Sequence, residues 1–359
     1  MSLNSDERPK EMPSSPPRSV PHTVSALVVV VLLVLVAAGA IGGTAAYYAL
    51  HPTRSTGGPG TVVVVDDLGR TVTVPTDTAR MVVLAPSIMD IVYRMGLRSH
   101  VVAVGCSPSI AGGIYNEYSP NQTTLWALTN SSCITDYPSL NTEAIANDTP
   151  GVVLASTITS EAAVTTLTQT YHIPVVILAP ADIEGIVGDV RLVAQLFPSA
   201  SSQAATLEAQ LSSTLSEVSS MDANLSSQQA PVPSVLLTYY FDTGGYYSYG
   251  PGTFGASLID LAGGTNLAAG SPLQYGEVNA TAVLNAQPAV VLYGTSWNDG
   301  YLVAGEIPSV WATAPYWSQL NGEKVPLDVT LLSEPGPSMV LALPELQHLL
   351  YPTLVPSPP

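Results

Sequence analysis

The amino-acid sequence predicts two α/β lobes joined by a long rigid helix, preceded by one N-terminal transmembrane helix. Three observations carry this prediction. Residues 24–50 contain no charged side chain and are rich in Val, Leu, Ala and Gly. Strand-like and helix-like segments alternate over residues 81–178 and resume after residue 230, a pattern typical of α/β folds. Between these blocks, residues 199–228 form one long helical pattern.

The chain is acidic and carries little charge. It has 359 residues, of which 27 are Asp or Glu and 10 are Lys or Arg. Charged residues make up 10%, against about 25% in a typical soluble domain. This balance excludes a nucleic-acid binder that neutralises phosphates, and the apolar share of 46% excludes disorder over most of the chain. A surface made polar by Ser, Thr, Asn and Gln stays polar at low pH, where carboxylates are protonated and lose their charge. We therefore interpret the composition as adaptation to an acidic external medium (hypothesis).

Residues 24–50 predict a membrane anchor. A helix of 27 residues is roughly 40 Å long, enough to cross a hydrocarbon core of about 30 Å with tilt. The apolar run is longer than the roughly 7–15 residues of a secretory signal, which favours an uncleaved helix. Residues 42–46 are small, as at a signal-peptide cleavage site, so cleavage of this segment is the alternative. Gly39 and Gly43 form a GxxxG pair, so self-association of this helix is a further expectation.

The charges around this helix predict its orientation. Arg8, Lys10 and Arg18 precede it, so residues 1–23 are expected to form a cytoplasmic tail. The main domain is then expected to lie outside the cell, after a flexible Gly- and Pro-containing linker at 51–60. We therefore expect a single-pass protein of the cell membrane.

The cysteines and the glycosylation sequons agree with an extracellular location. Cys106 and Cys133 are the two cysteines of the chain. If paired, they close a loop of about 27 residues. By lowering the entropy of the unfolded chain, such a disulfide would stabilise the folded state by roughly 3.5 kcal/mol. Two buried free thiols are the alternative. Sequons predict glycosylation at Asn121, Asn130, Asn224 and Asn279.

The first lobe is predicted over residues 61–180. It opens with a hairpin around residues 66–69, where a turn explains the Asp-Asp pair better than a metal site does. Ser87 is expected to cap a helix that Gly96 ends, and Asn141 to cap a second, short helix. The other expected elements are strands at 81–85, 101–104, 152–155 and 175–178, and a helix at 161–170.

The second lobe is predicted over residues 230–352. Residues 181–229 lead to it through two helices separated by Pro198, and the second of these is roughly 45 Å long if wholly helical. A proline-rich tail follows at 353–359. The expected elements of the lobe are strands at 235–239 and 289–293, and helices at 253–261, 280–285 and 340–350.

Four stretches of the exterior chain carry a family resemblance. They are DDLGRTVTVP (66–75), RMVVLAPSIMDIVYRMGLRSHVVAVG (80–105), LNTEAIANDTPGVVLAS (140–156) and GTFGASLIDLAGGTNLA (252–268). In this order they resemble the periplasmic-type binding proteins for cobalamin, ferric siderophores and haem that feed ABC importers. The resemblance covers residues 62–352. It implies the class III substrate-binding-protein architecture, with ligand held between two lobes and no covalent chemistry.

The resemblance also implies site residues. Aromatic side chains line the ligand cleft in this family, and Tyr offers a flat face and a hydroxyl at low entropic cost. By position we expect the ligand to contact Ser87 and six tyrosines: Tyr115, Tyr118, Tyr137, Tyr240, Tyr247 and Tyr275. Each tyrosine alone is equally well explained as an ordinary half-buried aromatic, but the clustering of Tyr over residues 239–249 favours binding. No resident cofactor, metal or catalytic residue is expected, and the ligand itself is a candidate metal chelate.

Docking on the permease uses one acidic residue per lobe in this family. Glu143 matches the first of these. Thr281 occupies the second position, so one docking charge is missing, and it also completes the Asn279 sequon. Glu277 lies nearby and is the alternative source of the second acid. The basic residues that often grip anionic chelates are absent from residues 329–339, so an uncharged or cationic ligand is expected.

Two functions therefore stay open. One is a membrane-anchored solute-binding protein that captures a cobalamin, a ferric siderophore or a similar chelate and delivers it to an ABC permease. The other is a cell-surface structural or adhesion protein that keeps the fold without transport. Thr281 and the sequons favour the second, and the tyrosine cluster favours the first. An enzyme is not expected, because the sequence lacks zinc-protease, CxxC and nucleotide-binding motifs.

Overall fold

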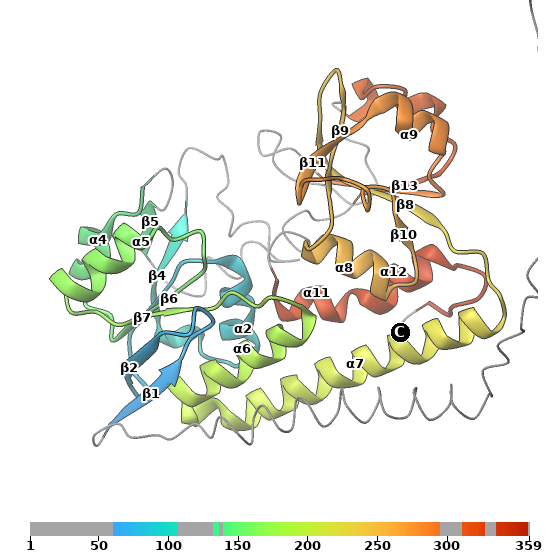
Figure 1. Ribbon diagram of the computed structural model, residues 1–359. Coiled ribbons are helices and arrows are strands. Elements are labelled where there is room, and N and C mark those ends of the chain that lie inside the picture. The colour runs from blue at the N-terminus through green and yellow to red at the C-terminus, as the bar shows by residue number, and fades with distance from the viewer. Residues whose placement is uncertain (1–59, 107–131, 136–138, 295–310, 327–334, 358–359) are drawn as a thin grey trace, which may run out of the picture. The chain divides into compact units, whose positions relative to one another are not determined.

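The computed structural model describes residues 60–106, 132–135, 139–294, 311–326 and 335–357 (Figure 1). The predicted cytoplasmic tail, membrane helix and linker lie outside these residues. Within the described ranges, no helix has both the length and the hydropathy needed to span a membrane. The anchor therefore stays a prediction.

The first lobe is built on a five-stranded parallel sheet. Its order is β5-β4-β3-β6-β7. Strands β3, β6 and β7 are buried throughout, which is expected of a parallel sheet covered on both faces. The strands span Met81–Val83 (β3), Val101–Cys106 (β4), Ser132–Thr135 (β5), Val152–Ala155 (β6) and Val175–Ile177 (β7). The helices of this lobe are α2 (Pro86–Arg94), α4 (Thr142–Asn147), α5 (Glu161–Thr165), which continues as a π-turn over Thr166–Thr170, and α6 (Ile183–Leu196).

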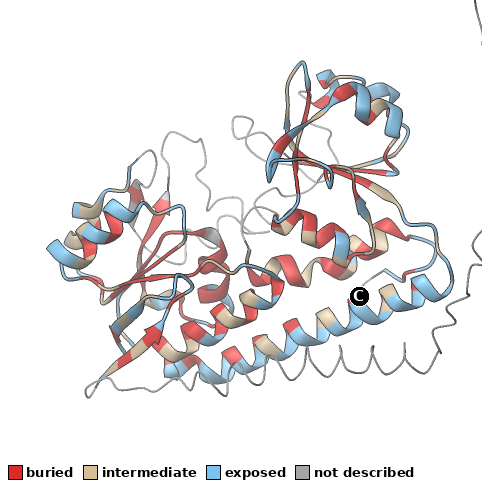
Figure 2. Ribbon diagram, in the orientation of Figure 1, coloured by how far each residue is buried: buried red, intermediate tan, exposed pale blue. Residues whose placement is uncertain are grey.

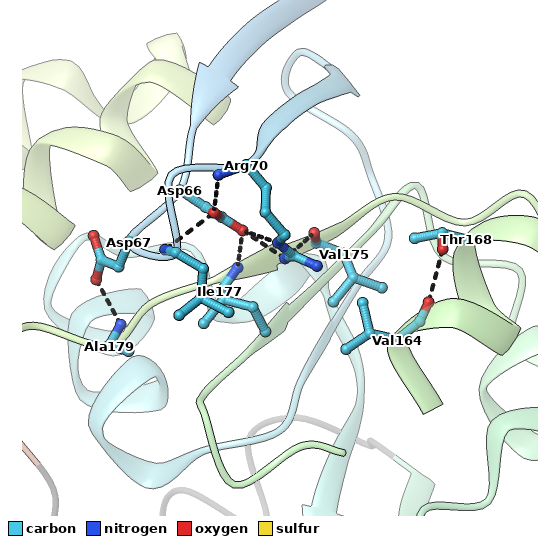
Figure 3. A network of polar contacts seen from close by, with 9 residues as sticks. Asp66, Asp67, Arg70, Val164, Thr168, Val175, Ile177 and Ala179 are labelled. Atoms are coloured by element: carbon cyan, nitrogen blue, oxygen red, sulfur yellow. Dashed lines mark hydrogen bonds and ion pairs between the residues drawn. The ribbon is translucent and has the colours of Figure 1, made fainter. Parts of the chain in front are cut away.

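An antiparallel hairpin of β1 (Thr61–Val65) and β2 (Thr71–Pro75) is fastened to this sheet through its turn. Figure 3 shows Asp66 accepting from the backbone N–H of Arg70 at 2.9 Å and from that of Ile177 in β7 at 3.2 Å. The guanidinium of Arg70 pairs with the same carboxylate and donates to the Val175 carbonyl at 3.1 Å. Asp67 accepts from Ala179 N–H. The Asp-Asp pair thus belongs to a turn, as the sequence predicted, and it also anchors the hairpin to the sheet.

The long helix α7 (Ser201–Ser227) follows a short 3₁₀ turn at Pro198–Ala200. It contacts α6 of the first lobe and, farther along, α8 (Phe254–Leu261), α11 (Pro337–Leu341) and α12 (Leu343–Leu350). Figure 2 shows its buried residues as a broken stripe along a helix whose other residues are exposed or intermediate. They are Ala204, Leu207, Leu211, Val218 and Leu225. The predicted connecting helix is confirmed.

The second lobe is built on a mixed six-stranded sheet of order β11-β9-β8-β12-β13, with β10 also paired to β8. Strands β8, β10, β12 and β13 run parallel, whereas β9 and β11 are antiparallel to their neighbours. The strands span Ser234–Phe241 (β8), Gly245–Tyr249 (β9), Thr265–Asn266 (β10), Tyr275–Asn279 (β11), Val290–Tyr293 (β12) and Glu323–Pro326 (β13). Helix α9 (Ala280–Ala286) and the 3₁₀ turns Trp311–Thr313 and Trp317–Gln319 complete the lobe.

The end of the chain returns to the first lobe. Helix α11 packs on α2 and α6, and Asp90 of α2 accepts from Ser338 N–H at 2.6 Å. Arg94 bridges Asp90 and the Ser338 hydroxyl, at 2.7 Å and 2.8 Å. The proline-rich tail is partly docked, because Val355 is buried and its carbonyl contacts His348 Nδ1 at 2.7 Å.

One expectation about local structure needs correction. Ser87 does not cap α2: the helix begins at Pro86, its N-cap is Ala85, and no side chain makes the cap bond. Proline favours the first helical position because its fixed φ suits the helix and it has no N–H to leave unpaired. Gly96, at φ +71°, ends this helix as expected, and Asn141 caps α4 as expected by accepting from Ala144 N–H.

Candidate functional site

A cluster of five tyrosines covers one side of strands β8, β9 and β11. We call it the tyrosine face, and its members are Tyr239, Tyr240, Tyr247, Tyr249 and Tyr275. The register places Tyr240 opposite Tyr247 and Tyr249 opposite Tyr275. Their ring centroids are 5.4 and 5.8 Å apart, within the range of favourable aromatic pairs.

The backbone explains how consecutive residues reach the same face. Side chains alternate along a strand, so Tyr247 and Tyr249 share one side of β9 while Tyr246 lies on the other, where burial raises its pKa to about 12. Tyr239 and Tyr240 are neighbours in the chain and would normally point apart. The pairing of β8 with β9 shifts register between Thr238 and Tyr240, and such an irregularity re-aims side chains.

The tyrosine face has a buried base and an exposed rim. Tyr249 is 1% exposed, whereas Tyr240 and Tyr275 are 42% and 54% exposed. Tyr239 lies between them, with its ring 5.1 Å from that of Tyr249 and 6.5 Å from that of Tyr275. Burial raises the pKa of Tyr239, and the neighbouring phenols of Tyr275 and Tyr247 raise it further. Exposed aromatic rings beside a packed base form a firm surface that can accept a broad apolar ligand.

Two carboxylates border this face. Asp242, in the β8–β9 turn, accepts from Gly244 N–H at 2.7 Å and from Tyr247 OH at 3.2 Å. The Gly244 N–H holds the pKa of Asp242 below its usual value, and Asp242 in turn raises the pKa of Tyr247. Glu277 lies opposite Tyr247 in the register of β11 and is exposed.

Gly244 allows the two carboxylates to share this corner. A Cβ atom at Gly244 would lie 2.4 Å from Glu277 Oε1 and 3.2 Å from Asp242 Oδ1. A side chain at that position would displace Glu277, so the glycine keeps both acids beside the tyrosines.

A family comparison identifies the fold that carries this site. The family model described as periplasmic binding protein matches residues 81–321. The chain belongs to the periplasmic binding protein family. A cobalamin-binding protein of Halobacterium salinarum is 24% identical over 291 residues, which cover 79% of this chain and 72% of that protein.

Solved structures of other periplasmic binding proteins share the fold. A periplasmic haem-binding protein from Pseudomonas aeruginosa superposes with a TM-score of 0.63 at 19% identity, covering 77% of this chain and 94% of that one. The periplasmic vitamin B12 binding protein of Vibrio cholerae gives a TM-score of 0.56 at 16% identity, covering 77% and 98%. The class III architecture expected from the sequence is thereby confirmed, and the related proteins are binding proteins.

The structure of this periplasmic binding protein brings some predicted site residues together. Tyr240, Tyr247 and Tyr275 meet on the tyrosine face. Ser87 is 5% exposed in the first turn of α2, in the other lobe. Three further predicted contacts lie outside the described residues: Tyr115, Tyr118 and Tyr137. The site prediction missed Asp242, although the sequence Asp-Thr-Gly-Gly after a strand is a recognisable Asx-turn signal.

The two candidate docking positions occupy equivalent places. Glu143 is the second residue of α4, which Asn141 caps, and Thr281 is the second residue of α9, which Asn279 caps. Both side chains are exposed. The equivalence agrees with the expectation that Thr281 stands where the second acidic residue would be. The docking role itself stays a prediction.

The predicted modifications also stay predictions. Asn224 on α7 and Asn279 at the start of α9 are exposed, whereas Asn121 and Asn130 lie outside the described residues. Strands β4 and β5 are neighbours, but Cys106 aligns with Thr135 and Cys133 aligns with Val104. The register does not place the two cysteines directly opposite each other, and the disulfide stays a prediction.

Proposed function

We propose that this chain is a membrane-anchored extracellular solute-binding protein that captures a metal chelate of the cobalamin kind and delivers it to an ABC permease. The observation that carries the proposal is the tyrosine face on the second lobe of a periplasmic binding protein. Its two exposed rings, Tyr240 and Tyr275, flank the half-buried Tyr239 and Tyr247.

The aromatic composition of this face suits a ligand with a large apolar surface. A corrin or porphyrin ring presents a wide apolar surface, and aromatic side chains bury such a surface at little cost in conformational entropy. The relatives named above include proteins for cobalamin and for haem, which are both metal macrocycles. That agreement supports a macrocyclic chelate as the ligand.

The membrane anchor and the outside location rest on the sequence. The uncharged run at 24–50, the basic residues before it and the exposed sequon residues Asn224 and Asn279 support this orientation. Protease treatment of intact cells tests it: the domain after residue 60 should be digested while the N-terminal tail survives. Survival of the whole chain in intact cells, with digestion after lysis, would contradict the proposed topology.

Ligand binding is tested by titrating the full-length protein in detergent with cyanocobalamin and with haemin, following tryptophan fluorescence. We expect micromolar or tighter binding of a macrocycle. The double variant Tyr240→Ala/Tyr275→Ala should weaken it about tenfold or more, because exposed aromatic anchors commonly contribute over 1 kcal/mol each. Tyr171→Ala is the matched control, since Tyr171 is 37% exposed in the first lobe.

A structural or adhesive role without transport is the second candidate, and Thr281 is the observation that favours it. A chain that binds no macrocycle and carries none through native purification, as judged by mass spectrometry, would support this candidate. Binding of a macrocycle by the wild type and its loss in the tyrosine variant would exclude it.

A further inference from the structure

The second lobe contains almost no positive charge. Residues 230–359 include nine Asp or Glu residues and a single basic residue other than histidine, Lys324. Lys324 lies on β13, whereas the tyrosine face reaches β11 at the opposite edge of the sheet. Its Nζ donates to the Leu320 carbonyl at 2.6 Å and lies 5.6 Å from the centre of the Trp317 ring. It is therefore engaged away from the tyrosines.

Positive charge from elsewhere in the chain is also limited. The segments outside the described residues beyond residue 60 are 107–131, 136–138, 295–310, 327–334 and 358–359, and their sequences contain no Lys or Arg. Among the arginines of the first lobe and α7, three are in ion pairs: Arg70, Arg94 and Arg191. Arg80 donates to the Asp148 carbonyl, and Arg98 lies over the ring of Tyr93 at 5.1 Å.

Negative charge, in contrast, is placed beside the tyrosines. Asp242 is fixed by the N–H groups of Gly244 and Gly245, at 2.7 and 3.3 Å, and by the hydroxyl of Tyr247. Glu277 faces the same turn from β11. The Tyr247 hydroxyl donates a hydrogen bond to Asp242. A carboxylate therefore lies at the polar edge of the Tyr247 ring. Aromatic faces beside carboxylates attract cations and repel anions.

We propose that Asp242 and Glu277 determine the charge selectivity of the tyrosine face, admitting neutral and cationic macrocycles and rejecting anionic ones. This inference rests on the proposed function, because it concerns the ligand of the same site. The two residues act as specificity determinants: they leave the aromatic contact available to any macrocycle and penalise those with peripheral carboxylates or sulfonates. Discrimination by repulsion of the wrong ligand is a general route to specificity.

Two synthetic porphyrins of equal ring size test the inference on the full-length protein in detergent. One carries four cationic N-methylpyridinium groups and the other four anionic sulfonatophenyl groups. We expect the wild type to bind the cationic porphyrin at least tenfold more tightly at low salt. Glu277→Gln and Asp242→Asn should each improve the affinity for the anionic porphyrin about fivefold, and high salt should reduce the effect.

Controls separate this site from the acidic surface as a whole. Glu161→Gln removes an exposed carboxylate from the first lobe and should leave the ratio of the two affinities unchanged. Porphyrin binding that persists in Tyr240→Ala/Tyr275→Ala is surface adsorption and is subtracted. Equal affinities of the wild type for both porphyrins, or a ratio that Glu277→Gln and Asp242→Asn do not change, would overturn the inference.

A parallel cyanocobalamin titration distinguishes the two levels of failure. If cyanocobalamin binds while the carboxylate variants leave the porphyrin ratio unchanged, charge selection is wrong and the proposed function stands. If the wild type binds neither cyanocobalamin nor either porphyrin, the proposed function fails, and the selectivity fails with it.

Discussion

Asp189 is a buried carboxyl on α6 whose protonation is coupled to folding. Only 2% of its surface is exposed, and its Oδ1 has no hydrogen-bond partner among the residues that the structure describes. Burial raises the pKa of Asp189 well above its ordinary value, and the negative charge of Asp67 raises it further. The folded protein therefore keeps this proton at pH values where the unfolded chain has released it.

This coupling gives a pH dependence of known sign. Between the unfolded pKa of about 3.9 and the raised folded pKa, the folded state binds one more proton, so the contribution of Asp189 to stability falls as pH rises. We expect Asp189→Asn to be more stable than wild type at pH 7 by about 1 kcal/mol or more, and the difference to shrink towards pH 3. Thermal unfolding at pH 3, 5 and 7 measures it.

The control for this prediction lies on the same helix. Glu184→Gln makes the same chemical change at an exposed position of α6 and should show no such trend. A wild type that is more stable than Asp189→Asn at pH 7 would contradict the prediction. The expected direction fits the acidic external medium that we inferred from the low charge of the sequence, because the protonated carboxyl is the form that folding favours.

At the scale of elements, most of the first lobe was predictable from local signals, but β5 (Ser132–Thr135) was missed. The apolar run Val152–Ala155 forms β6 with the predicted bounds, and Asn141 caps α4, because both depend on neighbouring residues alone. Strands β9 and β11 were missed. Each is a short tyrosine-containing segment whose strand character comes from antiparallel pairing across the sheet, which no local pattern specifies.

The candidate site was predictable only in part for the same reason. Sequence clustering favoured Tyr240 and Tyr247, the family resemblance added Tyr275, and the three do meet. The register shift that turns Tyr239 to the same side depends on the partner strand, so it could not be predicted from β8 alone. The Asp242 turn carried a usable signal, and Glu277 joined the site only through its register with β9.

The connecting helix α7 is the element whose packing matters most to both lobes. Leu211 is fully buried in α7 and belongs to the apolar cluster that contains residues of both lobes. We expect Leu211→Ala to lower the free energy of unfolding by about 2–5 kcal/mol, through lost burial and the cavity left behind. Urea unfolding measures this loss. Ser212→Ala, one residue further along and exposed, should change stability by less than about 0.5 kcal/mol.

At the scale of the whole molecule, one apolar cluster connects the two sheets. It includes Val62 of the hairpin, Leu211 of α7, Val235 and Leu292 of the second sheet, and Val355 near the C-terminus. The hydrogen bond from Ser338 N–H to Asp90 reinforces this continuity. The cluster holds the lobes in one folded unit, and the helix starts that carry Glu143 and Thr281 are exposed.

Those two helix starts provide the last prediction, which concerns delivery to a permease. Glu143 and Thr281 occupy equivalent second positions of Asn-capped helices, but only Glu143 is charged. A glutamate at 281 would supply the second acid and would also remove the Asn279 sequon. If docking relies on paired acids, Thr281→Glu should raise chelate uptake by intact cells severalfold at low salt, since charges at an interface mainly accelerate association.

Thr281→Val removes the sequon without adding charge, so the difference between these variants isolates the effect of the acid. Glu143→Gln should lower uptake in either background. Equal uptake by Thr281→Glu and Thr281→Val, with no loss in Glu143→Gln, would show that these helix starts do not dock a permease and would shift the balance towards a surface role without transport.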